Sequence, residues 1–151
     1  MKPLLEVQKL RKHFAMDDGV QPWLRRLRAW ASHTEPRWSA LHAVDNVSFT
    51  IGEGESVGLV GESGCGKSTL VSLLARLDEP TDGAIRFEGN DIASVPAKAF
   101  ARHPLRSAIQ VVFQDPHESL NPRYTAFDAI AEPLHRLCGM SGDKLAERVD
   151  Q

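Results

Sequence analysis

One short segment constrains the fold of this chain more than any other: GESGCGKST at positions 61–69. It matches G-x-x-x-x-G-K-[ST], in which glycines let the backbone come within hydrogen-bonding distance of phosphate oxygens. The apolar run SVGLVG (56–61) precedes it, and LVSLLARL (70–77), with leucines at i, i+3, i+4 and i+7, follows it. A strand, a glycine-rich loop and an amphipathic helix in this order predict an α/β domain with a phosphate-binding loop.

The parts of this loop have separate predicted roles. Successive backbone N–H groups are expected to surround an anion, assisted by the positive end of the following helix. Lys67 is expected to reach the β- and γ-phosphates of a nucleotide, and the Ser68 hydroxyl to bind Mg²⁺. Cys65 lies beside Lys67 at a helix N-terminus, which is typical of reactive thiols, but an inert filler position is an equal alternative. The predicted nucleotide-binding residues of the loop are Gly61, Glu62, Ser63, Gly64, Cys65, Gly66, Lys67, Ser68 and Thr69.

Composition and charge exclude several classes of protein. With 42% hydrophobic and 25% charged residues, the 151-residue chain is typical of one globular domain rather than of a disordered segment. It has no apolar run of membrane-spanning length and no signal-peptide pattern, and its two cysteines favour a reduced, cytosolic protein. The net charge of −2, divided as +3 over 1–50 and −5 over 51–151, argues against a nucleic-acid partner. The six histidines show no ligand spacing, so no histidine metal site is expected and most are taken as solvated surface.

The rest of the chain predicts further regular elements and one unusual segment. Strands are expected over four more segments, namely 4–14, 41–51, 84–89 and 108–113. GEGE (52–55) is expected to form a turn. Thr125 and Asp128 predict a capping box for a helix that ends near Leu137, and Ser141 is expected to cap a last helix.

The unusual segment, residues 20–40, holds all three tryptophans and four arginines between two predicted strands. One interpretation is a surface excursion whose tryptophans pack back onto the domain. The other is a basic amphipathic helix that docks on a membrane surface or a partner. The first interpretation is favoured, because about ten residues make a marginal helix.

The order of these motifs resembles that of the ATP-binding subunits of ABC transporters. SVGLVGESGCGKSTL (56–70) is followed by IQVVFQDPHESLNPR (109–123), and FQDP-x-x-SLNPR together with the long insertion is most similar to the peptide/nickel importer branch. The resemblance covers roughly residues 4–138. It implies an α/β fold of the P-loop NTPase class and of the ABC ATPase type. The fold would be truncated, with an antiparallel β subdomain and the Walker A half of the core. Residues 1–113 would form the N-terminal part of the ATPase domain, and 114–151 the Q-loop and the start of the helical subdomain.

The resemblance also implies roles for two residues outside the loop. Phe14 matches the A-loop aromatic, which in the family stacks on adenine; the alternative is an ordinary core residue at a strand end. Gln114 matches the Q-loop glutamine, whose amide touches Mg²⁺ and the attacking water, although the residues alone indicate only a turn. Gln114 and Lys67 are therefore the predicted catalytic residues, and Ser68 and Gln114 the predicted metal ligands.

The function that the resemblance implies is an ATPase subunit that couples ATP to the import of peptides or a related small solute. ATP and Mg²⁺ are the expected cofactors. The expected partners are a second ATP-binding subunit, transmembrane permease subunits and, indirectly, an extracytoplasmic solute-binding protein, at the cytoplasmic face of the inner membrane. The family's signature motif, Walker B carboxylates and switch histidine do not occur in these residues, so this chain alone is expected to bind ATP without hydrolysing it. The alternatives are a non-catalytic nucleotide-binding remnant and a soluble ABC-type ATPase.

Overall fold

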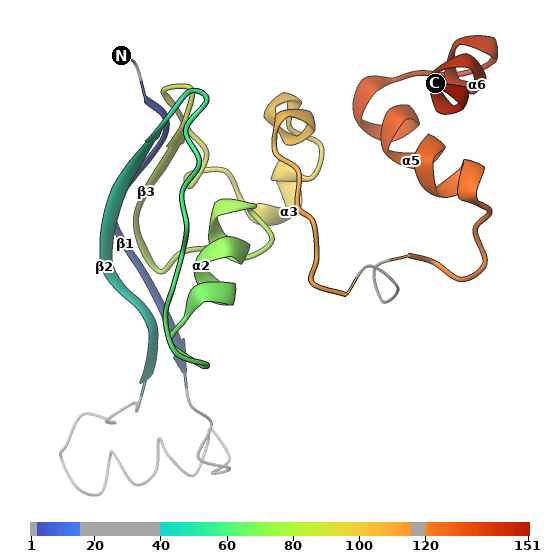
Figure 1. The fold of residues 1–151 in the computed structure, drawn as a ribbon. Helices are drawn as coiled ribbons and strands as arrows, with labels where there is room; N and C mark the ends of the chain where they lie inside the picture. The colour runs from blue at the N-terminus through green and yellow to red at the C-terminus, as the bar shows by residue number, and fades with distance from the viewer. Residues whose placement is uncertain (1–2, 16–39, 116–119) are drawn as a thin grey trace, which may run out of the picture. The chain divides into compact units, whose positions relative to one another are not determined.

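The computed structural model describes residues 3–15, 40–115 and 120–151, which divide into two compact units (Figure 1). The first unit is Met1–Val95 and the second is Pro96–Gln151. The predicted insertion at 20–40 lies outside the described residues except for Ala40, which begins a strand. The predicted functional division at residue 113 stays a prediction.

The first unit is built on a four-stranded antiparallel sheet with the strand order β2-β1-β3-β4. Its strands are β1 (Pro3–Ala15), β2 (Ala40–Gly52), β3 (Asp82–Phe87) and β4 (Asn90–Asp91). The first strand in the sequence therefore lies inside the sheet, as Figure 1 shows, with Val7 paired to Phe49 on one side and to Ile85 on the other. This sheet confirms the predicted antiparallel β subdomain and the strands expected over 4–14 and 41–51. The strand expected over 84–89 is present as β3 but begins two residues earlier and ends at Phe87, because Glu88 and Gly89 form a turn.

Helix α2 (Lys67–Leu74) packs beside β2 and covers one face of this sheet (Figure 1). Its Leu70 and Leu73 are buried, as the leucine spacing predicts. The helix ends three residues earlier than predicted, because Arg76 adopts a left-handed φ of 55° and closes it. Leu77 therefore falls beyond the helix and is 50% exposed. The sheet contributes further large core side chains, namely Val7, Leu10, Val44, Ile85 and Phe87.

Two predicted strands do not form. Residues 56–61 have no regular structure, and neither have 109–113, while Ala108 belongs to a 3₁₀ helix. Apolar strands of this kind are held by hydrogen bonds from neighbours in a parallel sheet, and no strand in the described part of the chain pairs with either segment. As a result Val60 is 93% and Val112 95% exposed.

The second unit is helical. It contains α3 (Ala97–Phe100), the 3₁₀ helix η1 (Pro104–Ala108), α5 (Ala126–Cys138) and α6 (Asp143–Asp150). The predicted capping box is confirmed, because Thr125 Oγ1 accepts from the Asp128 N–H at 3.2 Å and Asp128 Oδ2 accepts from the Thr125 N–H at 3.0 Å. The predicted cap at Ser141 is wrong: the N-cap of α6 is the next residue, Gly142, whose φ of 61° suits glycine and which offers no side-chain cap. Over the described ranges, no helix has the length and apolar character needed to cross a membrane.

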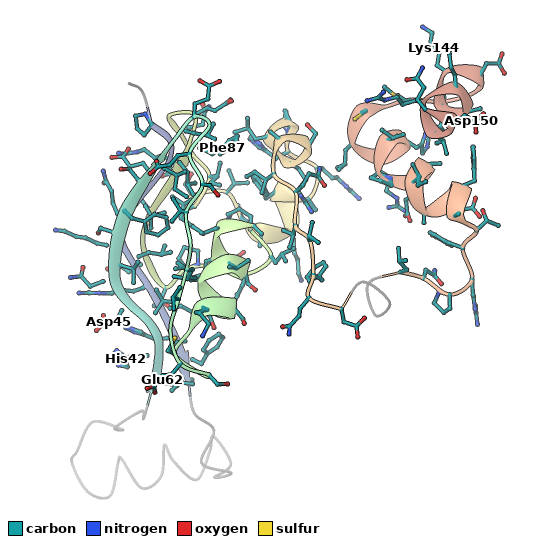
Figure 2. The ribbon with its side chains drawn as sticks, in the orientation of Figure 1. His42, Asp45, Glu62, Phe87, Lys144 and Asp150 are labelled. Atoms are coloured by element: carbon teal, nitrogen blue, oxygen red, sulfur yellow. The ribbon has the colours of Figure 1, made fainter. Side chains whose placement is uncertain are left out.

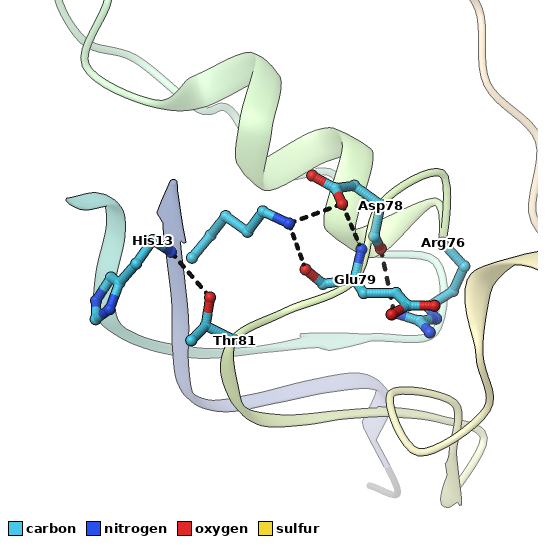
Figure 3. A network of polar contacts seen from close by, with 6 residues as sticks. His13, Arg76, Asp78, Glu79 and Thr81 are labelled. Carbon is cyan, nitrogen blue, oxygen red and sulfur yellow. Dashed lines mark hydrogen bonds and ion pairs between the residues drawn. The ribbon is translucent and has the colours of Figure 1, made fainter. Parts of the chain in front are cut away.

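A polar network joins β1 to the chain that follows α2 (Figure 3). Lys12 Nζ donates to Asp78 Oδ1 at 2.7 Å and to the Glu79 carbonyl at 2.8 Å, and the Glu79 N–H also donates to Asp78 Oδ1. Burial alone would raise the pKa of Asp78. The hydrogen bonds from Lys12 and Glu79, with the charges of Lys12 and Arg76, outweigh it and hold this pKa below its ordinary value.

This network gives a prediction on stability and pH. A carboxylate whose pKa is depressed by folding stabilises the fold above its unfolded pKa, and the contribution disappears as the pH falls through the folded pKa. Because the Asp78 side chain is 37% exposed, Asp78→Asn is expected to lower the free energy of unfolding by only about 0.5–1 kcal/mol at pH 6. At pH values below its depressed pKa the variant and the parent should be equally stable. Urea unfolding followed by circular dichroism at both pH values measures this, with Glu147→Gln on α6 as the control; an unchanging difference would contradict it.

Candidate nucleotide-binding site

The phosphate-binding loop opens directly into α2. Gly66 is the N-cap of this helix, with a left-handed φ of 97°, and it provides no side-chain cap. The first turn contains no acidic residue. Uncapped N–H groups at the positive end of a helix make a favourable position for an anion, so the local structure matches the predicted role of the loop.

The side chain of Lys67 is held by the loop itself. Its Nζ donates to the carbonyl oxygens of Gly61 and Glu62, each at 2.7 Å, and lies 3.6 Å from Cys65 Sγ. Gly61 and Glu62 therefore contribute backbone oxygens that position the ammonium. The lysine ammonium is thereby held against the first two residues of the loop.

The loop is pressed closely against β2. A Cβ atom built on Gly66 would lie 2.1 Å from the Ala43 carbonyl oxygen, a separation that no side chain tolerates. Gly64 also has a positive φ, of 81°, but a Cβ there would meet open space. Glycine is thus required at Gly66 by both conformation and contact, and at Gly64 by conformation alone.

A pocket of about 430 Å³ lies between the loop and the adjoining ends of β1 and β2. Figure 2 shows His42 and Asp45 of β2 at the same end of the sheet as Glu62 of the loop. The lining residues are Phe14, Leu41, His42, Ala43, Ser63, Gly64, Cys65, Gly66, Lys67, Ser68 and Thr69. The fold therefore brings Phe14 together with the seven loop residues 63–69 around one cavity.

Phe14 forms part of the pocket wall and not of the core. It is 39% exposed, pairs across the strands with Leu41, and has Lys12 Nζ at 4.9 Å from its ring centroid. An exposed aromatic face beside a phosphate-binding loop is suited to stacking on a nucleobase. Its role as the adenine-stacking residue stays a prediction.

Gln114 lies in the second unit, where it is exposed in a segment without regular structure. The pocket is formed entirely by residues of the first unit. The predicted contribution of Gln114 to Mg²⁺ binding and catalysis therefore stays a prediction.

Sequence reasoning did not identify Leu41, His42 and Ala43 as wall residues. They have no motif of their own and enter the pocket because β2 pairs with β1 in the register that places Leu41 opposite Phe14. Once Phe14 is assigned to the site, residues opposite it on the paired strand are expected to lie beside it, which identifies this stretch of β2 as part of the pocket wall.

The chain belongs to the ABC transporter family, whose family model, described as "ABC transporter", matches residues 44–151. This result confirms the family predicted from the phosphate-binding loop and the FQDP segment. It also confirms the fold class.

Several curated relatives of this chain are named as peptide or oligopeptide ATP-binding proteins. The chain is 44% identical over 131 residues to a probable peptide ABC transporter ATP-binding protein, y4tS, of Sinorhizobium fredii, covering 87% of this chain and 33% of that protein. The oligopeptide transport ATP-binding protein AppF of Bacillus subtilis is 39% identical over 132 residues, covering 87% of this chain and 36% of that protein. A putative peptide import ATP-binding protein of Brucella ovis is 46% identical over 112 residues, covering 74% and 35%. The chain thus spans about a third of the length of these relatives.

Solved structures confirm the fold. The ATP-binding cassette MJ0796, in a dimeric post-hydrolysis state bound to ADP and Pi, aligns with a TM-score of 0.69 at 24% identity, over 96% of this chain and 53% of that one. The structure of cbiO1 from Clostridium perfringens, part of a cbiONQ transporter complex, aligns with a TM-score of 0.63 at 22% identity, over 99% and 49%.

Proposed function

We propose that this chain binds ATP as the loop-bearing part of an ATPase subunit that drives a peptide importer. The observation that carries the proposal is the single pocket formed by Phe14 and the loop residues 63–69. In it the phosphates lie on the N–H groups of the loop and on Lys67, and the adenine stacks on Phe14. Each contact uses a group that the fold leaves accessible. These groups are the uncapped N–H groups at the start of α2, the Lys67 ammonium and the exposed ring of Phe14.

The residues present also fit a Mg²⁺ ion. Mg²⁺ prefers oxygen ligands and is usually held by one or two protein groups together with substrate phosphates and water. The Ser68 hydroxyl, on the first turn of α2 and on the pocket wall, is such a group. When bound, the ion neutralises charge on the β- and γ-phosphates. Gln114 is proposed as a second ligand that also orients the attacking water.

The proposed setting is the cytoplasmic face of the inner membrane. The printed names of the relatives, which are peptide and oligopeptide ATP-binding proteins, support peptide import. The dimeric state of the aligned cassette supports pairing with a second ATP-binding subunit. The remaining proposed partners are permease subunits in the membrane and, through them, an extracytoplasmic solute-binding protein.

The test of this function is the metal dependence of ATP binding by the Ser68→Ala variant. Because Ser68 acts through the metal, the variant should bind ATP several-fold more weakly than the parent in Mg²⁺, and equally well in EDTA. Isothermal titration of the folded chain with ATP measures both conditions, and Ser107→Ala in η1 is the matched control. Equal losses with and without Mg²⁺ would show that the loop does not hold the metal as proposed.

Alkylation of the two cysteines gives an independent test of the same pocket. Both thiols are exposed, but only Cys65 lines the pocket, beside Lys67 Nζ. Mg·ATP is therefore expected to slow alkylation of Cys65 at least several-fold and to leave Cys138, in α5, unchanged. Mass spectrometry of iodoacetamide-treated chain gives both rates in one sample. Equal slowing of the two thiols, or none at Cys65, would count against nucleotide binding in this pocket.

A further inference from the structure

Two histidines lie side by side at one end of the first sheet. His13 of β1 and His42 of β2 are direct partners in the strand register, and their ring centroids are 4.0 Å apart. Residues opposite each other on antiparallel strands share one face of the sheet, so the two imidazoles present their nitrogens to a common space. The spacing of the histidines along the sequence gives no sign of this pair.

A β-bulge brings a carboxylate to the same place. Residues three apart in a regular strand point to opposite faces. Between Lys12 and His13 of β1, the register on β2 advances by two residues, which leaves Ala43 as an extra residue. Asp45 thereby joins His42, and the ligand atoms of His13, His42 and Asp45 all lie within 4.8 Å of one another. Figure 2 shows His42 and Asp45 next to each other on β2.

One nitrogen of this group lacks a partner. His13 Nε2 is buried and has no hydrogen-bond partner among the residues that the structure describes. A buried polar atom without a partner is unfavourable, and in native proteins it commonly indicates an ion or water. His42 and Asp45 are exposed, so a metal ion can reach the group from solvent.

We propose that His13, His42 and Asp45 form a zinc site beside the nucleotide pocket, whose wall includes His42. Two imidazole nitrogens and one carboxylate oxygen are a usual ligand set for Zn²⁺, with water in the fourth tetrahedral position. Zinc bonds of 2.0–2.2 Å place tetrahedral ligand atoms about 3.4 Å apart, which side-chain rotation of this cluster reaches. Mg²⁺, which prefers oxygen ligands in an octahedron, does not suit two imidazoles.

One basic side chain competes with the metal for Asp45. Arg11 Nε lies 3.4 Å from Asp45 Oδ1, and Arg11 Nη1 lies 3.8 Å from Asp82 Oδ2. Zinc takes the place of Arg11 at Asp45, while Arg11 keeps Asp82 as an ionic partner. Lys12 is engaged with Asp78 and Glu79 and does not face the cluster as a free charge.

The zinc site goes beyond the proposed function and does not depend on it. Its ligands come from β1 and β2 and not from the phosphate-binding loop. The two sites nevertheless adjoin, because His42 lines the pocket and the Ala43 carbonyl faces Gly66. A failure of ATP binding and a failure of zinc binding would therefore be separate results.

The experiment is a zinc titration of the full chain carrying Cys65→Ser and Cys138→Ser, so that no thiol competes. One equivalent of Zn²⁺ is expected to bind, and His42→Ala and Asp45→Asn should each weaken binding at least tenfold. His135→Ala, on α5, should leave the affinity unchanged, and Mg²⁺ should not bind the cluster. Absence of one-to-one binding, or equal affinity in His42→Ala and His135→Ala, would overturn the proposal.

If a histidine variant does not fold, chemical footprinting of the chain with all its histidines intact tests the zinc site instead. Diethyl pyrocarbonate modifies accessible imidazoles, and mass spectrometry resolves each modified histidine. Zn²⁺ should protect His42 at least tenfold while His135 continues to react at the same rate. Equal protection of both histidines, or none at His42, would overturn the site.

Discussion

Gly66→Ala is expected to reduce ATP affinity more than a hundredfold, the largest effect that the structure predicts. The new Cβ would lie 2.1 Å from the Ala43 carbonyl oxygen, so either the loop or β2 has to move. The left-handed φ of 97° adds a backbone penalty of about 1–2 kcal/mol for a residue with a side chain. The displacement of the loop also misaligns its amides. Together, the two effects should cost more than the roughly 2.7 kcal/mol of binding free energy that corresponds to a hundredfold loss of ATP affinity. Isothermal titration with Mg·ATP measures it.

The neighbouring glycine is the matched control for this substitution. Gly64→Ala introduces the same methyl group into the same loop at a φ of 81°, but the methyl meets open space. Only the backbone penalty of about 1–2 kcal/mol applies there, so the loss of affinity should be clearly smaller. Thermal unfolding by circular dichroism should show the same order. If both variants lose affinity equally, the contact with Ala43 does not shape the loop.

Lys67→Ala is expected to weaken ATP binding about ten- to a hundredfold, whether or not Mg²⁺ is present. The variant removes the ammonium group that donates hydrogen bonds to the Gly61 and Glu62 carbonyls of the loop. A hydrogen bond between charged groups contributes about 1.5–3 kcal/mol, which sets this range. Because the contact is direct, its loss does not depend on the metal, in contrast to that of Ser68.

The control for Lys67 is Lys144→Ala, which removes an exposed lysine from α6 in the other unit. It makes the same change in net charge, so it reports any general effect of charge on nucleotide binding. We expect its ATP affinity to equal that of the parent. An unchanged affinity in a folded Lys67→Ala chain would contradict the assignment of the pocket to nucleotide.

Local chemistry made parts of this molecule predictable from sequence. The loop motif predicted a glycine-rich turn that opens into a helix, and Gly66 has the left-handed conformation at the N-cap of α2 that only glycine readily adopts. The Thr125 and Asp128 spacing likewise specifies a capping box whose two hydrogen bonds are made within four residues. Alternation of apolar and polar residues predicted β1 and β2, which bury Val7, Leu10 and Val44.

The features that could not be predicted from the sequence depend on contacts between residues that are far apart in the chain. The runs at 56–61 and 109–113 have strand composition, but a parallel strand exists only with neighbours, and the described residues supply none. His13 and His42 come together through strand register and a bulge, neither of which leaves a local pattern. The end of α2 at Leu74 depends on Arg76 in a left-handed conformation, which its residue type does not indicate.

The position of β1 has a consequence for how the protein is made. The ribosome delivers β1 before either of its partners, and the second partner is complete only when Phe87, which pairs with Leu5, has been synthesised. At translation rates of about 5–20 residues per second, the 35 residues between Gly52 at the end of β2 and Phe87 take about 2–7 seconds, during which β1 has one open edge. A strand that is made before both of its partners is thus an inner strand of the sheet. Trimming residues 3–15 would leave β2 and β3 with no common partner, and the pocket would lose Phe14 at the same time.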